Sequence, residues 1–157
     1  MTDKSLQKSF RKAVTQLEQD LFKLADGENT IKGTKDKPIV TDSQALPIEH
    51  FFMEGVYVRK MTMQKGLAVI GAIHKHLHMC FLTEGHVSVA DETGTKEYVA
   101  PCHIIATPGV KRVLYAHKHS VWYNTHKNPT NTTSTDEIES NTVSVDYKQY
   151  DEYIKNK

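Results

Sequence analysis

The 157-residue sequence has two cysteines, one tryptophan and almost no net charge. Cys80 and Cys102 are too few for a disulfide framework, which favours a reducing compartment. The formal charge of +1 provides no strong field for nucleic acid or for an anionic membrane. We therefore expect neither as a partner.

Long apolar runs are also missing from the sequence. None approaches the roughly 20 residues that span a bilayer, and the N-terminus lacks the apolar centre of a signal peptide. Apolar residues make up 38% and charged residues 25% of the chain, which is ordinary for a globular protein. The length indicates one domain with a single core.

A helical pattern opens the chain over residues 1–26, where we expect a helix from residue 3. Its apolar face would consist of Phe10, Val14, Leu17, Leu21 and Leu24. This spacing is typical of a coiled-coil seam between protomers, but an amphipathic helix packed on its own domain has the same pattern. Residues 27–47 are polar, contain glycine and proline, and predict a linker or an extended arm.

Short β segments follow one another closely over residues 48–126. This pattern predicts a sandwich or barrel and argues against βαβ units. Residues 127–142 are rich in Thr, Asn, Ser and Asp and predict a loop, and the tail over residues 146–157 predicts a short helix. Residues 127–157 would thus form a polar loop and tail behind the barrel.

Histidines at alternate positions single out residues 71–85, which we expect to form a strand. Side chains alternate between the two faces of a strand. One face would carry His74, His76, His78 and Cys80. The other face would carry Ile73, Leu77, Met79 and Phe81.

This alternation suggests a metal site, because neutral imidazole is the commonest metal ligand. Residues i and i+2 lie about 6.6 Å apart along a strand, and residues i and i+4 about 13 Å apart. His74 and His76 can therefore share an ion, whereas His74 and His78 would need a bend in the strand. We expect His126 as the third ligand and Cys80 as a weaker candidate. A hydrogen-bonded polar interior or a surface strand would explain the same pattern.

Two motifs resemble those of the cupin superfamily, the RmlC-like jelly rolls. Gly71, His74-x-His76 and residues 81–89 resemble the first motif, and residues 108–110 resemble the approach to the second. In particular the chain resembles small single-cupin proteins encoded by tailed phages, and that likeness is carried by residues 46–50, 54–59, 109–113 and 122–126. The resemblance implies a double-stranded β-helix (the cupin-type barrel), a homo-oligomer and often a divalent metal in the barrel.

Two positions depart from the cupin motifs. Cys80 stands where the first motif normally has a glutamate, and Arg112 where the second normally has a histidine. The resemblance therefore transfers only His74 and His76 as ligands. A set of imidazoles without a carboxylate suits Zn, Ni or Fe better than Mn or Mg.

We interpret the chain as a phage-encoded, non-enzymatic accessory or structural platform, located in the host cytoplasm or on the virion. Its partners would be copies of itself and a phage or host protein. A metal-dependent oxygenase, lyase or isomerase acting on a small molecule is the first alternative, and a small-ligand binding module is the second. The pocket of such a site would be lined by Tyr57, Cys80, Arg112, Tyr115 and Trp122.

Overall fold

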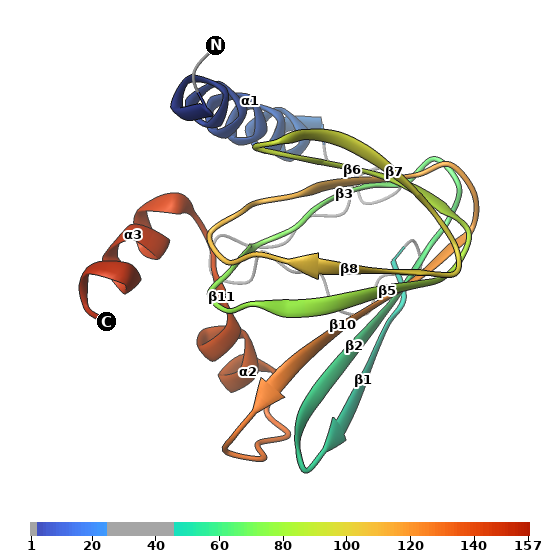
Figure 1. The fold of residues 1–157 in the computed structure, drawn as a ribbon, viewed down its shortest axis with the longest axis vertical. Helices are drawn as coiled ribbons and strands as arrows, with labels where there is room; N and C mark the ends of the chain where they lie inside the picture. Colours follow the sequence, from blue (N-terminus) through green and yellow to red (C-terminus); the bar gives the residue numbers. More distant parts are fainter. Residues whose placement is uncertain (1–2, 25–45) are drawn as a thin grey trace.

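The computed structural model describes residues 3–24 and 46–157 (Figure 1). The helices are α1 (Asp3–Leu24), α2 (Thr135–Thr142) and α3 (Tyr147–Lys155). The strands are β1 (Ile48–Met53), β2 (Gly55–Met63), β3 (Ala68–Ile70), β4 (Ile73–His74), β5 (His78–Glu84), β6 (His86–Asp91), β7 (Gly94–Val99), β8 (Cys102–Ala106), β9 (Val113–Ala116), β10 (Ser120–Asn128) and β11 (Val143–Ser144). None of the helices in these residues is long and apolar enough to cross a membrane.

Two antiparallel sheets face each other across the core. Their strand orders are β1-β2-β10-β5-β8 and β3-β9-β6-β7. Along the chain, β2, β5, β8 and β10 of the first sheet alternate with β3, the β6–β7 pair and β9 of the second, which is the connectivity of a jelly roll. The predicted fold class is therefore confirmed: the chain is mainly β, a double-stranded β-helix with an N-terminal helix and a short C-terminal helix.

The core between the sheets is built by strand alternation. Met63, Leu82 and Val87 are fully buried, and Trp122 is nearly so. Fully burying one side chain of this size stabilises the fold by about 1.5–3 kcal/mol. The two sheets thus form a packed frame that fixes the positions of the polar side chains at one end of the barrel.

The histidine segment is not one continuous strand, contrary to our prediction. β4 ends at His74, the chain bends at Lys75 and His76, and β5 begins at His78. A bend of this kind is what allows residues i and i+4 to point into the same space. The prediction assumed alternation through the whole segment and named a bend only as the condition under which His74 and His78 could share an ion.

The apolar face of this segment points outward from Leu77 onward. Leu77, Met79 and Phe81 are 65%, 39% and 38% exposed, while Cys80 and Leu82 are buried. Alternation begins at His78, so the histidine face is the interior face of the barrel.

The polar segment after the barrel also differs from its prediction as a loop, because it contains α2. Ser134 caps this helix and accepts a hydrogen bond from the backbone N–H of Glu137. β11 then pairs with β4, placing Val143 opposite His74. The C-terminal segment therefore supports the strand that carries the first histidine.

Helix α1 packs on its own domain, next to the turn between β6 and β7 (Figure 1). The carboxylate of Glu92 in that turn accepts hydrogen bonds from Gln7 Nε2 at 2.6 Å and Arg11 Nε at 2.8 Å. Val14 is buried, while Leu17 of the predicted seam is 41% exposed. The seam between protomers stays a proposal.

Candidate metal centre

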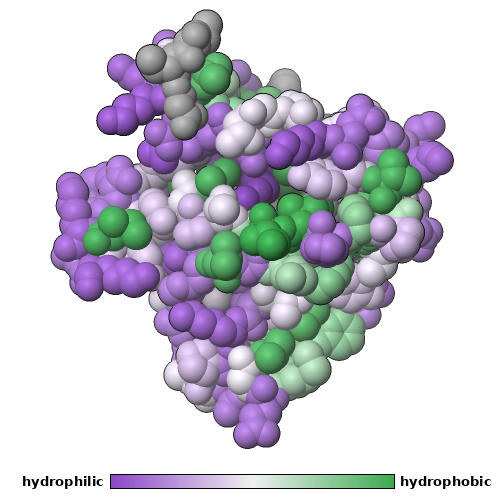
Figure 2. All heavy atoms as spheres, in the orientation of Figure 1, coloured by the Kyte–Doolittle hydropathy of each residue, from purple (hydrophilic) through white to green (hydrophobic). Residues whose placement is uncertain are grey.

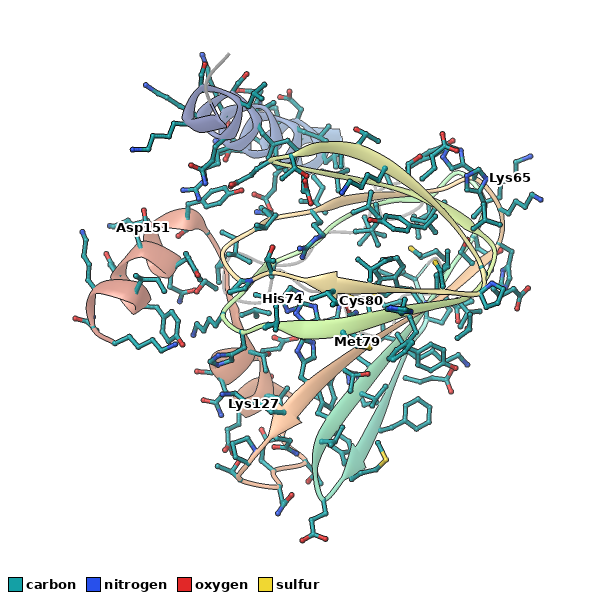
Figure 3. The ribbon with its side chains drawn as sticks, in the orientation of Figure 1. Lys65, His74, Met79, Cys80, Lys127 and Asp151 are labelled. Atoms are coloured by element: carbon teal, nitrogen blue, oxygen red, sulfur yellow. The ribbon has the colours of Figure 1, made fainter. Side chains whose placement is uncertain are left out.

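Three histidines from three strands meet inside the barrel: His74 on β4, His78 on β5 and His126 on β10. The ring centroids lie 4.0 Å apart for His74 and His78, 4.6 Å for His78 and His126, and 5.1 Å for His74 and His126. One ligand atom from each residue lies within 4.8 Å of the other two. Figure 3 shows His74 near the end of the barrel that faces α2, with Cys80 further along β5.

Backbone hydrogen bonds hold His74 and its surroundings in place. The backbone oxygen of His74 accepts a bond from Gly109 N at 2.9 Å, and Lys75 N donates to the backbone oxygen of Thr142 at 2.8 Å. The first bond ties β4 to the turn before β9, and the second ties the bend to the end of α2. The position of His74 therefore depends on elements distant in sequence.

Burial keeps all three imidazoles neutral. It lowers the pKa of His78 from 6.5 to about 4 and the pKa of His126 from 6.5 to about 3. The pKa of His74 falls well below 6.5, through burial and through the nearby His78 and His126. At neutral pH each ring therefore offers a lone pair, as a metal ligand requires.

Hydrogen bonding orients one of these rings for metal binding. His78 Nδ1 lies 3.2 Å from the backbone oxygen of His76. Because a carbonyl oxygen only accepts, Nδ1 carries the proton, and Nε2 carries the lone pair. His74 Nδ1 is buried and finds no hydrogen-bond partner among the residues that the structure describes. An ion would satisfy such an atom, so the donor set fits a metal.

The number and type of donors indicate the class of ion. Three imidazoles without a carboxylate match Zn, Ni or Fe better than Mg or Mn. Structural zinc sites are closed by four protein ligands, whereas catalytic sites have three and keep one position open. The described residues supply three donors here.

His76 lies outside this cluster. Its ring meets that of Tyr153 edge-on, with centroids 6.2 Å apart. The bend turns its side chain away from His74, and only its backbone oxygen contributes, through His78. The structure thus groups His74 with His78 and His126, and metal binding by any of them stays a prediction.

Of the residues expected to line a pocket, three lie in the barrel interior. Tyr57 is buried, stacks on His126 with centroids 6.1 Å apart, and its hydroxyl lies 2.7 Å from His50 Nδ1. Cys80 and Trp122 are buried in the core next to the cluster. Burial raises the pKa of Cys80 to about 12, so this residue stays a neutral thiol at neutral pH.

The other two residues expected to line the pocket, Tyr115 and Arg112, are not part of the histidine cluster. Tyr115 is 44% exposed on β9 of the four-stranded sheet, and it does not belong to the cluster of His74, His78 and His126. Arg112 has a largely buried side chain, with Nε 4.0 Å from Asp91 Oδ2. It is nevertheless close enough to the histidines for its charge to lower the pKa of His74 and His78.

Two interior residues were missed from the sequence, Asn124 and Arg59. The side-chain oxygen of Asn124 accepts bonds from Trp122 Nε1 at 3.1 Å and from Cys80 Sγ at 3.2 Å. Arg59 Nε is buried and unpartnered within the described part of the chain. Alternation was the available signal, because Asn124 shares a face with Trp122 and His126, and Arg59 shares one with Tyr57.

The sequence matches no protein-family model and no curated protein. Similar solved structures include an RmlC-like cupin from Shewanella frigidimarina (17% identity, TM-score 0.48, 61% of this chain and 88% of that one). They also include KdgF from Halomonas sp. (9%, 0.47, 53% and 78%) and the Cnp3 cupin domain of Schizosaccharomyces pombe (20%, 0.46, 55% and 63%). The chain is thus similar to cupin proteins, while its fold class follows from its own strand order.

Proposed function

We propose that the protein is a metal-dependent, cupin-like enzyme that acts on a small anionic molecule inside the barrel. The observation that carries this proposal is the meeting of three neutral imidazoles, from His74, His78 and His126, in the barrel interior. A bound divalent ion would polarise a ligand oxygen and lower the pKa of bound water.

The residues around the histidines support an anionic ligand. The charges of Arg59 and Arg112 both reach His74 and His78, whose pKa values they lower. Burial lowers the pKa of Arg59, and the nearby charge of Glu139 acts in the opposite direction, so part of that positive charge is already balanced. An anion bound at the ion would balance the remainder.

Tyr57 and Asn124 would position the ligand and the histidines. Burial raises the pKa of Tyr57 to about 12, so its hydroxyl keeps its proton and can donate a hydrogen bond. Asn124 is close enough to His78 to influence its pKa, which burial lowers, and would help to hold that ring. Such outer partners orient metal ligands in known sites.

Elemental analysis of the untagged protein after dialysis against zinc tests the metal centre. We expect about one equivalent of zinc to be lost in a His78→Ala/His126→Ala variant. The matched control is His103→Ala, because His103 is an exposed histidine on β8 and does not belong to the cluster. Equal zinc content in wild type and in the double variant would overturn the proposal.

A second candidate function, a non-enzymatic platform, is supported by the outer face of the five-stranded sheet. The pairing register aligns Phe51, Val58, Thr125, Met79 and Ile105 in one row across all five strands. Phe51, Met79 and Ile105 are 43%, 39% and 60% exposed. Figure 2 shows hydrophobic side chains gathered in the middle and lower right, where strands of this sheet run.

We assign this row to contact with a second copy of the chain, since an isologous dimer would bury the same apolar patch on both protomers. Sedimentation velocity should then show a dimer for wild type and for Thr95→Asp, a change at an exposed site on β7, and a monomer for Ile105→Asp. A monomeric wild type at micromolar concentration would refute this assignment. The origin of the chain in a tailed phage stays a prediction from its sequence.

A further inference from the structure

A second group of potential metal ligands lies outside the barrel, on the outer face of the four-stranded sheet. Val87 and Val89 of β6 point into the core, so the alternate residues His86 and Ser88 point outward. The group consists of His86, Glu97 and His117, and one ligand atom from each lies within 4.8 Å of the other two.

The pairing register builds this group. Tyr115 pairs with Ser88, and His117 N donates to the backbone oxygen of His86 at 2.9 Å, so the two histidines stand side by side on neighbouring chain segments. Glu97 of β7 pairs with Ser88 and is therefore diagonal to His86. Strands β6 and β7 and the residue that follows β9 thus present the three side chains from hydrogen-bonded backbone, which limits the reorganisation that an ion would require.

Side-chain contacts already draw the donors together. His86 Nε2 lies 2.9 Å from Glu97 Oε2, and the rings of His86 and His117 lie 4.5 Å apart between centroids. His117 Nε2 lies 2.6 Å from Ser88 Oγ, and the Tyr115 ring meets the His117 ring edge-on at 5.0 Å. Ser88 and Tyr115 therefore restrain the His117 ring.

We propose that His86, Glu97 and His117 form a second, solvent-facing site for a divalent transition metal, with zinc as the ion that suits it. Two imidazoles and a carboxylate are zinc ligands, and this set disfavours magnesium and calcium, which prefer oxygen. The ion would replace the hydrogen bond between His86 and Glu97 and link β6, β7 and the connection between β9 and β10. The Glu97 side chain is 64% exposed, so the remaining coordination position faces water.

The outer site differs from the barrel centre in chemistry and in access. It includes a carboxylate, which reduces the net charge of the loaded site, and it opens to solvent instead of to the interior. An alternative explanation of the same contacts is an imidazole–carboxylate ion pair with no affinity for metal. The two explanations differ in how many zinc ions the protein binds.

Equilibrium dialysis of the full chain against micromolar free zinc, followed by elemental analysis, distinguishes them. We expect wild type to bind one equivalent more than His117→Ala and one more than Glu97→Gln. The glutamine keeps a hydrogen-bond acceptor for His86 but removes the carboxylate ligand. The control His103→Ala removes an exposed imidazole from the other sheet and should bind as wild type does.

Equal zinc content in wild type, His117→Ala and Glu97→Gln would overturn the second site. Each comparison changes only the outer residues, so the result is independent of whether the barrel histidines hold an ion. Far-UV circular dichroism should be the same for all four proteins, because these side chains lie outside the core. As a further readout, zinc should raise the melting temperature of wild type more than that of Glu97→Gln, since an ion bound only by the folded state stabilises it.

Discussion

Acidification from pH 6.5 to 5 should destabilise the metal-free protein through its barrel histidines. In the folded state the pKa is about 4 for His78 and about 3 for His126, against 6.5 for the exposed side chain. Between these values the unfolded chain binds more protons than the folded one. The free energy of unfolding therefore falls as the pH falls, and this contribution is fully present only above pH 6.5.

The magnitude follows from the width of the pH window. A window of about 1.5 pH units at about 1.4 kcal/mol per unit gives roughly 2 kcal/mol for each of these two histidines. His74 changes the stability in the same direction, because its pKa is also lowered. The three rings are neighbours and titrate together, so we expect a total of about 4 kcal/mol, not a simple sum over all three.

Urea unfolding at pH 7 and at pH 5, in the presence of a chelator, measures this loss. Carboxylates titrate mostly below pH 5, so the window isolates histidine. His119→Asn, which replaces an exposed histidine, should lose as much stability on acidification as wild type does. An unfolding free energy that is unchanged or higher at pH 5 would refute the account of buried neutral histidines.

Three further predictions concern the frame that holds the site, and each is measured by urea denaturation. Leu82→Ala should cost about 2–5 kcal/mol, because Leu82 is fully buried and its truncation leaves a cavity; a cost below 1 kcal/mol would contradict this packing. Gly85→Ala should destabilise strongly, since Gly85 has φ +94° and an added Cβ would lie 2.2 Å from Ser120 Oγ; a neutral result would refute that close approach. Glu18→Ala should cost more than Lys111→Met, because it leaves the buried Lys111 ammonium without the carboxylate that it contacts at 2.7 Å; the reverse order would contradict the buried ion pair.

The sequence predicted the fold class because the relevant signals are local. Short β segments with turn residues between them indicated a barrel, and helical spacing indicated α1. The capping residue Asp146, whose side chain accepts a bond from Gln149 N, marks the start of α3 in the expected tail. In α2 the signal was present as Ser134-x-x-Glu137, but the polar composition of residues 127–142 concealed it.

The candidate site was only partly predictable, because its geometry depends on contacts distant in sequence. Alternation gave the interior face of β5, yet the bend after His74 arises where β11 and the end of α2 pair with this segment. No local pattern shows that pairing. Hydropathy alone does not identify the outer face of β5, because exposed Met79 and Phe81 have the same hydropathy as buried side chains.

The second cluster was missed for a related reason. His86 and His117 are far apart in the chain, and neither lies in the segment of alternating histidines. Only the register between β6 and β9 brings them side by side. The register between two strands depends on how their buried faces align in the folded sheet. The pattern of one strand alone does not show which residues it pairs with.

Anomalous diffraction at the zinc absorption edge, from crystals of the zinc-loaded protein, tests the central claim most directly. The account predicts a peak in the barrel about 2.0–2.1 Å from nitrogen atoms of His74, His78 and His126. A peak on the outer cluster of His86 and His117 alone, or none at all, would contradict a metal centre in the barrel.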